Sequence, residues 1–416
     1  MKLWTWTFVV LLIYVSVSVI RFDDFGSGQQ MELIPGTAGE EEEEQMGRMK
    51  VFVYELPSNF NEDIVQRDPR CLTHMFAAEI YFHRFLLTSQ VRTLNPEEAD
   101  WFYTPVYTTC DLTTEGLPMS YRSPRMIRSA IQLISSNLPY WNKTEGSDHF
   151  FLVPHDFAAC FHYDEDEAIQ RGIHSLLQRA TLVQTFGQRN HVCMKEGSII
   201  IPPYVPPNRL QSHLVPQNTP RSIFVYFRGL FYENKNDPQR GHYARGARAS
   251  LWENFKNNHL FDISPERPIT YYEDLQRAVF CLCPLGWAPW SPRLAESLIF
   301  GCIPVIIADE IVLPFSDTIP WKEIGIFVAE EDIPKLDTIL TSIPPKVIVQ
   351  KQRLLDNPTI KNTMLFSEIP RPGDAFHQIL NGLLRKLPHD KKIYLNPGEK
   401  VLDWNAGPEG DKIPWE

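Results

Sequence analysis

Short apolar runs and longer amphipathic stretches alternate along the chain from about residue 50 onward. The apolar runs are rich in β-branched and aromatic residues, which is typical of strands, whereas the stretches between them repeat their apolar positions with helical spacing. In the first half the predicted strands are KVFVYEL, ADWFYTPV, HFFLV and TLVQTF, and the predicted helices are residues 73–87, 124–138 and 164–179. Strands that alternate with helices in this way predict a parallel sheet.

A proline-rich stretch, residues 201–220, interrupts this alternation, and a second series follows it. Its predicted strands are SIFVYF, VFCLC, IPVII and GIFVA, and its predicted helices include residues 245–257 and 271–277. The fold class that we expect is therefore α/β, with two doubly wound Rossmann-type domains, residues 50–205 and 221–385, that face each other across a cleft. Residues 386–416 would form a C-terminal tail.

The first 49 residues differ from the rest of the chain. Leu3 to Ile20 form an almost uncharged apolar run that Arg21 closes. A run of about 18 apolar residues is marginal for a membrane span and long for the core of a signal peptide, so residues 1–21 are expected to be an N-terminal membrane anchor, which we favour, or a signal peptide. Residues 22–49 contain five consecutive glutamates and are expected to be an acidic, flexible stalk.

Composition narrows the class of protein. With 416 residues and 43% apolar content, the chain can supply the cores of two domains. A net charge of −11, without a long basic run to offset it, argues against a nucleic-acid partner. If the chain enters the secretory pathway, Asn142 in the sequence Asn-Lys-Thr becomes a glycosylation site.

The seven cysteines would then lie in an oxidising compartment, where one is left over if the others pair within the chain. Their connectivity is open. Cys281 and Cys283 fall in a predicted buried strand and Cys302 adjoins another, so we interpret these three as small core residues rather than as disulfide partners. The CxC spacing, without a matching Cys or His pair, predicts no zinc site.

The segment from Val279 to Asp309 reads as strand, loop, helix and strand, which is one βαβ unit. Ser291 is a candidate N-cap with Pro292 at the first helical position, so the free amides of this helix would face an anionic ligand beyond the strand's carboxyl end. Arg293 and Glu296 lie three residues apart on one helix face. They would offer a guanidinium for a phosphate and a carboxylate for a sugar diol, and a surface ion pair is the alternative interpretation.

The loop before this helix holds Gly286 and two tryptophans, Trp287 and Trp290. Two large aromatic side chains are more than a connection needs, and they would form a wall for a base or a sugar ring. We therefore expect a donor-binding site that includes Gly286, Trp287, Arg293 and Glu296.

Further cations are expected at this site. Arg228 ends the strand IFVYF and precedes Gly229, which would let the backbone approach a phosphate closely; a salt bridge at the strand end is the alternative. Arg245 and Arg248 follow in RGHYARGARAS. Arg245 is the better candidate because glycine follows it, although a solvated basic face would explain both arginines. Fixed cations at this site would stabilise the negative charge of a bound phosphate group.

Asp156 follows His155 at the end of the predicted strand HFFLVP and is the candidate base for removing a proton from an attacking hydroxyl. Burial would raise the pKa of Asp156 and a protonated His155 would lower it, and an ordinary turn-forming aspartate is the alternative. The sequence Asp164-Glu165-Asp166 is similar to an Asp-x-Asp metal motif. It begins a predicted helix, where acidic residues are favoured, so we expect no metal site there.

Several motifs between about Lys50 and the C-terminus are similar to those of a known protein family. They are KVFVYELP, DPRCLTHMFAAEIYFHRFL, ADWFYTPVY, DHFFLVPHDFAACFHY, TFGQRNHVC, IFVYFRGLFY, the segment at 279–309 and GDAFHQILNGL. These motifs resemble those of the exostosin-type glycosyltransferases, and in particular the plant irregular-xylem subfamily of xylan xylosyltransferases. Two small departures are Ala158, where glycine is usual, and LAESLIF, which replaces a more valine-rich sequence.

The resemblance implies a GT-B-like arrangement of the two domains and an inverting, single displacement from a UDP-sugar, with no cofactor and no metal strictly required. It favours a catalytic role for Asp156 beside His155, and it makes His74 a neighbour of the acceptor site. Polysaccharide sites stack sugars on aromatic rings, and the predicted strand in WFYTPVY leads toward the cleft. Core packing explains Trp101 equally well, so Tyr107 is the acceptor-binding candidate.

The function that the resemblance implies is elongation of the β-1,4-xylan backbone of plant cell-wall glucuronoxylan, from UDP-xylose to a xylan or xylo-oligosaccharide acceptor. The alternatives are a glucuronosyltransferase acting on xylan and a non-catalytic structural subunit of a xylan synthase complex. The charged candidate residues argue against the last of these. The expected setting is the Golgi membrane, with a single-pass type II glycoprotein, a luminal catalytic domain and other xylan-synthesis proteins as partners.

Overall fold

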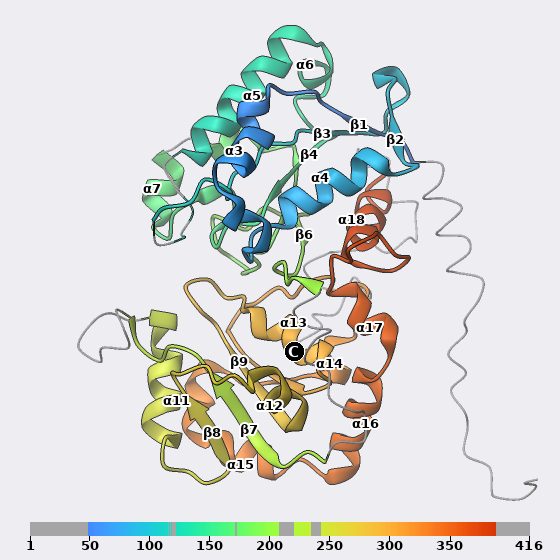
Figure 1. Ribbon diagram of the computed structural model, residues 1–416. Coiled ribbons are helices and arrows are strands. Elements are labelled where there is room, and N and C mark those ends of the chain that lie inside the picture. The colour runs from blue at the N-terminus through green and yellow to red at the C-terminus, as the bar shows by residue number, and fades with distance from the viewer. Residues whose placement is uncertain are drawn as a thin grey trace, which may run out of the picture. The chain divides into compact units, whose positions relative to one another are not determined.

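The computed structural model describes residues 49–387, except for residues 115, 117, 119–121, 171–172, 208–219 and 234–242. The expected membrane anchor or signal peptide, almost all of the expected stalk and the tail beyond residue 387 lie outside the described residues. Within them, two parallel sheets with surrounding helices form an α/β fold (Figure 1).

The first sheet has the strand order β2-β1-β3-β4-β5-β6, and every pairing in it is parallel. Its strands are β1 (Val51–Val53), β2 (Arg92–Thr93), β3 (Trp101–Tyr103), β4 (His149–Val153), β5 (Thr181–Gln184) and β6 (Ile199–Ile200). The helices of this part of the chain are α3 (Glu62–Arg67), α4 (Ala78–Thr88), α5 (Ser123–Asn137), α6 (Tyr140–Thr144), α7 (Glu165–Gln170) and α8 (Ile173–Leu176).

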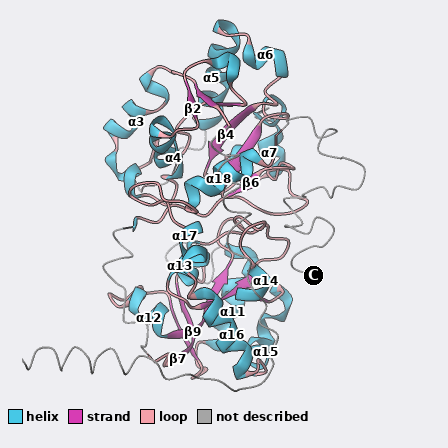
Figure 2. Cartoon of the chain, turned by 90° about the vertical axis from the view of Figure 1, so that its right-hand side faces the viewer, coloured by secondary structure: helices cyan, strands magenta, loops and turns pink. Residues whose placement is uncertain are grey.

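The second sheet has the order β11-β10-β9-β7-β8 and is also parallel throughout. Figure 2 shows its strands β7 and β9 among the helices of this part of the chain. Its strands are β7 (Ile223–Arg228), β8 (Phe261–Ser264), β9 (Ala278–Pro284), β10 (Ile303–Ile307) and β11 (Ile326–Phe327). The helices that follow in sequence are α11 (Ala247–Phe255), α12 (Tyr271–Arg277), α13 (Pro292–Ile299), α14 (Trp321–Ile324), α15 (Leu336–Thr341), α16 (Pro345–Leu355), α17 (Pro358–Thr363) and α18 (Ala375–Leu384).

The two sheets share one topology. In each, the first strand lies between the second and the third, so the chain reverses direction across the sheet between β1 and β3, and again between β7 and β9. Ligands of open parallel sheets bind outside the carboxyl ends of the strands at such a reversal. The predicted pair of doubly wound Rossmann-type domains with a GT-B-like architecture is thereby confirmed. The carboxyl ends of β7 and β9 are where a nucleotide is expected to bind.

The sequence pattern predicts the central strands better than the edge strands. All residues of β4 and β10 are buried, as continuous apolar runs in a sheet covered on both faces require, and both strands have the predicted bounds. The pattern does not predict strands β2, β6 and β8. The first two are only two residues long, and the edge strand β8 carries the exposed Asp262 in its second position.

Helix α18 packs on the first sheet's side of the chain, although the expected second domain extends to residue 385. The indole Nε1 of Trp101 donates to Leu383 O at 3.1 Å, and the ring of Phe376 lies 5.4 Å from that of Phe82 on α4. A Cβ at Gly382 would lie 2.9 Å from Ile199 of β6. The C-terminal helix therefore contributes to the core of the N-terminal part, which the order of residues alone does not reveal.

The interpretation of the cysteines is wrong for two of the three residues. Cys281 of β9 forms a disulfide with Cys302, and further disulfides join Cys71 to Cys110 and Cys160 to Cys193. Strands β9 and β10 are neighbours, and the residue before β10 comes within a Cα–Cα distance of 5.8 Å of Cys281. Cys283 is the buried free thiol, as the odd number of cysteines requires.

A short antiparallel bridge connects the segment after β5 to the segment after β10. The amide of Arg189 donates to Glu310 O at 2.8 Å, and the amide of Val312 donates to Gly187 O at 3.0 Å. A Cβ at Gly187 would overlap with the carbonyl oxygen of Val312. Only glycine fits here because the two backbones approach so closely.

We expect Gly187→Ala to lower the free energy of unfolding by about 1–3 kcal/mol, the usual cost of forcing an extra methyl group into a packed contact. Thermal unfolding followed by circular dichroism measures this change. Gly286→Ala is the matched control, because the nearest atoms to a Cβ at Gly286 are 3.6 Å away. Equal melting temperatures for wild type and Gly187→Ala would show that the bridge between the two segments is not tight.

Candidate functional site

Arg293 lies in the first turn of α13 and reaches the end of β7. Its Nε donates to Arg228 O at 3.0 Å, its Nη2 donates to the same oxygen, and its Nη1 donates to the N-cap Ser291 Oγ at 3.3 Å. The guanidinium lies over the ring of Phe227, 4.8 Å from its centroid. Among the described residues no carboxylate forms an ion pair with it. Its charge is therefore available to an anion at the reversal point between β7 and β9.

Gly229 has a role that differs from the predicted one. A Cβ at this position would overlap with Nη2 of Arg293. The glycine therefore makes room for the arginine, and its benefit to a phosphate would be indirect.

The guanidinium of Arg228 takes a different direction from that of Arg293. Its Nη2 forms an ion pair with Asp262 Oδ1 of β8 at 2.6 Å, and its Nη1 donates to Asp262 O at 2.7 Å. The side chain also stacks on the ring of Tyr226, 4.4 Å from its centroid. The alternative interpretation, a salt bridge at a strand end, describes Arg228 correctly, because the unpredicted strand β8 supplies the acidic partner.

Arg245 is likewise neutralised. Its guanidinium pairs with the carboxylate of Glu330, with 3.2 Å between Nε and Oε2, and its Nη2 donates to Asp309 O after β10. Its backbone has a φ of +51°, just before α11. Three residues later, Arg248 lies within α11 and is buried, with 4% of its surface exposed. The expectation that Arg245 is the better candidate of the two is not supported by these contacts.

Glu296 is nearly buried on α13 and is held by two neighbours that sequence reasoning missed. Its Oε1 accepts from Arg267 Nη2 at 3.1 Å, and its Oε2 accepts from the hydroxyl of Tyr271 at 2.6 Å. Burial raises the pKa of Tyr271 well above its usual value, so this hydroxyl remains a donor. Because each oxygen of this carboxylate accepts one hydrogen bond, its orientation is fixed, and each oxygen keeps a further lone pair for a ligand hydroxyl.

The two tryptophans of the loop before α13 have different environments. Trp287 is 53% exposed and stands edge-on to Tyr243, with 5.5 Å between the ring centroids. Trp290 is only 6% exposed, and its indole Nε1 is buried with no hydrogen-bond partner among the residues that the structure describes. Gly286 lies between Trp287 and β9. A Cβ there would lie 3.6 Å or more from its nearest neighbours, so the fold does not demand glycine at this position.

Asp156 follows β4 and is partly exposed. Within the described part of the chain, nothing donates a hydrogen bond to its carboxylate, and burial raises its pKa to about 7. The adjacent His155 is buried, and its Nδ1 accepts the backbone amide of Phe157 at 3.1 Å. An unpaired carboxylate with a pKa near neutrality has the properties of a general base.

Phe76 brings the two predicted parts of the site together. Its ring centroid lies 6.0 Å from that of Trp290, in an edge-to-face contact, and 6.2 Å from that of His155. His74 contacts the same ring, with 4.9 Å between centroids. The turn that carries Asp156 and the loop that precedes α13 therefore pack on the same aromatic side chain, and His74 lies beside them as a neighbour.

The acceptor-binding prediction for Tyr107 is wrong. Its side chain is completely buried, with its hydroxyl 2.9 Å from His83 Nδ1. The ring belongs to the core of the first domain, because the chain after β3 turns inward toward α4. Tyr107 can therefore not stack on a sugar.

Two peripheral predictions concern Asn142 and the acidic sequence at residue 164. Asn142 is exposed in α6, where its amide donates to Ser135 O at 2.8 Å. Asp164 precedes α7 and accepts the amide of Glu167 at 3.0 Å, and Glu165 and Asp166 lie in the first turn of this helix, where acidic residues are expected. The described residues contain no group of three or more His, Cys, Asp or Glu side chains placed to hold a metal ion.

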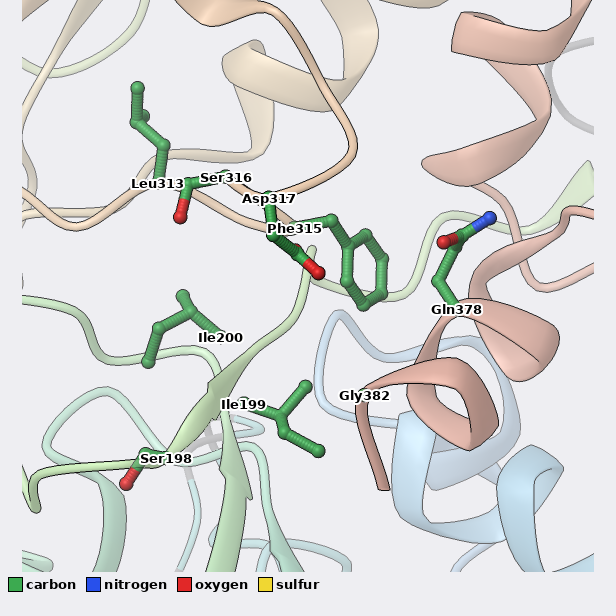
Figure 3. Close-up of a pocket in the computed structure, with 9 residues that line it drawn as sticks. All are labelled: Ser198, Ile199, Ile200, Leu313, Phe315, Ser316, Asp317, Gln378 and Gly382. Atoms are coloured by element: carbon green, nitrogen blue, oxygen red, sulfur yellow. The ribbon is translucent and has the colours of Figure 1, made fainter. Parts of the chain in front are cut away.

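A small cavity lies elsewhere, between β6, the segment 313–317 and α18 (Figure 3). Its volume of about 10 Å³ is room for about one water molecule, and Ser198 Oγ on its wall is buried with no hydrogen-bond partner in the described part of the chain. A cavity of this size holds no sugar or nucleotide, so it is not the functional site.

Comparison with known proteins shows the family of this chain. The Exostosin GT47 domain model matches residues 45–343. The chain is 69% identical to the probable beta-1,4-xylosyltransferase IRX10L and 67% identical to the probable beta-1,4-xylosyltransferase IRX10, both of Arabidopsis thaliana, over 100% and 98% of both chains respectively. It is also 70% identical to the probable glucuronosyltransferase Os01g0926700 of Oryza sativa, over 93% of each chain.

Among solved structures, the chain is similar to UGT89C1 of Arabidopsis thaliana complexed with UDP. The identity is 16%, the match covers 81% of this chain and 98% of that chain, and the TM-score is 0.31. This similarity is too low to carry an argument, whereas the identities to the plant transferases and the domain match are decisive. The chain belongs to the exostosin GT47 family of glycosyltransferases.

Proposed function

We propose that this chain is an inverting β-1,4-xylosyltransferase that elongates the xylan backbone from UDP-xylose. The relatives named as probable xylosyltransferases, which match the chain from end to end, support this assignment. The observation that carries it in the structure is the contact of Phe76 with both Trp290 and His155. This contact brings the loop before α13, the helix that carries Arg293, near the turn that carries Asp156.

In the proposed reaction, the residues at the start of α13 bind the donor. The guanidinium of Arg293 and the amides at the start of α13 bind the diphosphate, and Glu296 accepts hydrogen bonds from the ribose diol. Trp287 offers an exposed aromatic face beside them. As the bond between the sugar C1 and the diphosphate oxygen breaks, negative charge grows on the diphosphate, and fixed cations stabilise it without a metal ion.

Asp156 and its neighbours after β4 activate the acceptor. Asp156 takes the proton of the attacking xylan hydroxyl while that oxygen forms its bond to C1 of the donor sugar and UDP leaves. Attack from the face opposite to the diphosphate inverts the configuration, so an α-linked donor gives a β-linked product. His155 packs on Phe76 and Phe161 and orients the turn, and His74, which contacts the same Phe76 ring, is proposed as a neighbour of the acceptor.

We place the protein at the Golgi membrane, with its catalytic part in the lumen, an N-terminal anchor and other xylan-synthesis proteins as partners. The family assignment and the apolar segment Leu3–Ile20 support this setting. None of the helices within the described residues combines the length and the apolar character needed to cross a bilayer.

A glucuronosyltransferase acting on xylan is the second candidate, because several rice relatives of the same identity carry the name probable glucuronosyltransferase. The two donors differ at C5 of the sugar, where UDP-glucuronic acid carries a carboxylate. An additional free cation beside the donor sugar would favour it. Arg228 and Arg245, two of the arginines expected at the donor site, are already paired with Asp262 and Glu330.

The donor can be tested directly. The full chain, incubated with a fluorescently labelled xylo-oligosaccharide and UDP-xylose, is expected to give a ladder of products that grow by one pentose, detected by mass spectrometry. UDP-glucuronic acid should give no product under the same conditions. Transfer of glucuronic acid alone would replace our assignment by the second candidate, and no transfer from either donor, with intact folding, would favour the non-catalytic subunit.

The rate should depend on pH through Asp156. Its pKa is raised to about 7 by burial, and only the ionised form accepts a proton, so kcat/KM should fall about tenfold per pH unit below 7 and level off above it. Asp156→Asn should lower kcat by a factor of about 10²–10⁴ while UDP still binds. Full activity in this variant would remove Asp156 from the mechanism.

A control is needed for this pH profile, because Glu79 is fully buried and its pKa is also raised to about 7 by burial. Its carboxylate accepts from the amides and hydroxyls of Thr108 and Thr109, so its lone pairs are used by the fold. The acidic limb should persist in Glu79→Gln. Its disappearance there would assign the limb to the fold rather than to the base.

The structure separates the two arginines that the sequence treats alike. Arg293→Ala should weaken UDP binding about 10- to 100-fold, as expected for loss of a hydrogen-bonded charge at an anion. Arg228→Ala, the matched control, should change UDP affinity by less than about threefold, since its charge is neutralised by Asp262. Isothermal titration calorimetry measures both, and an equal loss in the two variants would contradict the contacts described above.

A further inference from the structure

We propose that Arg248 is a positioning residue for the diphosphate: it fixes the loop before α13 and adds a positive charge beneath the phosphate site. This inference rests on the proposed function, because it presumes that a nucleoside diphosphate binds at the ends of β7 and β9. It concerns a residue that neither the family match nor the leading sequence candidates single out.

The contacts of Arg248 join the two strands of the reversal point. Its Nε donates to Leu285 O at 2.8 Å and its Nη2 donates to Pro284 O at 3.3 Å, both at the end of β9. Its Nη1 donates to Leu230 O, two residues after β7, at 3.2 Å. One side chain from α11 thus ties together the two backbone segments that border the predicted phosphate site. Without it, these hydrogen bonds no longer fix the distance between the two loops.

The charge of Arg248 is not balanced within the described part of the protein. Among the described residues no carboxylate forms an ion pair with it, and its hydrogen-bond acceptors are carbonyl groups. Burial lowers the pKa of Arg248 to about 10, so the group stays protonated at neutral pH in spite of the cost of burying a cation. The nearby guanidinium of Arg293 adds to this cost, because it repels Arg248.

The two cations share one aromatic ring. The guanidinium carbon of Arg248 lies 5.4 Å from the ring centroid of Phe227, and that of Arg293 lies 4.8 Å from it. Arg248 also lies 4.9 Å from the centroid of Tyr243. Both guanidinium groups therefore lie against one ring at the reversal point between β7 and β9, and a buried charge is screened little by salt. An unbalanced pair of cations, one of them buried, is a costly arrangement that a bound dianion or trianion relieves.

A merely structural arginine would behave differently from a positioning one. If Arg248 only supported the fold, its loss would lower stability and weaken every ligand to the same extent. If it acts on the diphosphate, its loss must weaken UDP more than uridine, because uridine carries no phosphate. The ratio of the two affinities is therefore the decisive quantity, and it does not depend on whether the protein transfers xylose.

The experiment compares binding of uridine, UMP and UDP to the full chain and its variants by isothermal titration calorimetry. In Arg248→Met we expect the ratio of UDP to uridine affinity to fall at least tenfold, with UMP between them. Arg277→Met is the control, because Arg277 is an exposed arginine on α12 that pairs with Asp274. An unchanged ratio in Arg248→Met would overturn the proposal.

Arg248→Lys keeps the test decisive if Arg248→Met does not fold. Lysine retains the charge, but its single ammonium group does not reproduce the planar fork that reaches both loops. We expect uridine to bind this variant as it binds wild type, and UDP to bind at least threefold more weakly. The inference would be wrong if wild type and Arg248→Lys bound UDP equally well and the ratio of UDP to uridine affinity were unchanged in every folded variant. Wild-type protein that binds UDP and yet transfers no xylose would refute the proposed function and leave the role of Arg248 standing.

Discussion

The edge-to-face contact between Phe76 and Trp290 is the interaction on which the arrangement of the site depends. The candidate base follows a strand of the first sheet, and the candidate cations follow strands of the second. Besides the backbone bridge between the segments after β5 and β10, a contact between the loops that carry these residues helps to fix their relation. Phe76 makes that connection, since it contacts Trp290 as well as His155 and His74. The disulfide between Cys160 and Cys193 stiffens the same neighbourhood.

Much of the fold follows from local sequence pattern, because a strand covered on both faces has to be apolar throughout. This is why β4 and β10 have their predicted bounds. Helix α12 also has its predicted bounds, because its apolar positions repeat with helical spacing. The pattern fails where tertiary contacts decide. Strand β8 is an edge strand with an exposed aspartate, and α18 returns to the first domain to pack its Phe376 on α4. The pairing of Cys281 with Cys302 depends on two strands being neighbours, which periodicity does not report.

The candidate site shows the same division. Sequence reasoning places residues at strand ends, because the carboxyl ends of parallel strands are where ligands bind, and Asp156 and Arg293 are found there. Sequence reasoning does not give the direction of a side chain. Arg228 has the position of a phosphate ligand, but its partner Asp262 lies on a strand that the pattern does not predict. Arg245 and Arg248 are three residues apart, yet one precedes α11 and pairs with Glu330 while the other lies inside it and is buried.

Some polar groups of this protein make all their hydrogen bonds within the fold, whereas others have a donor or an acceptor without a partner among the described residues. Lys351 donates to three carbonyl oxygens in and around α14, and Glu79 accepts four hydrogen bonds, so both groups are fully used by the fold. Around Phe76 the situation differs, since among the described residues the partly exposed carboxylate of Asp156 has no donor and the buried indole N–H of Trp290 has no acceptor. An unmade hydrogen bond to a buried group costs about 1–3 kcal/mol, and natural proteins tolerate such costs chiefly where a ligand completes the set. Ser198 Oγ beside the small cavity also lacks a partner among the described residues, so an unmade hydrogen bond does not by itself mark a site. What distinguishes the neighbourhood of Phe76 is that two such groups, Asp156 and Trp290, lie on loops from the two sheets that pack on one ring.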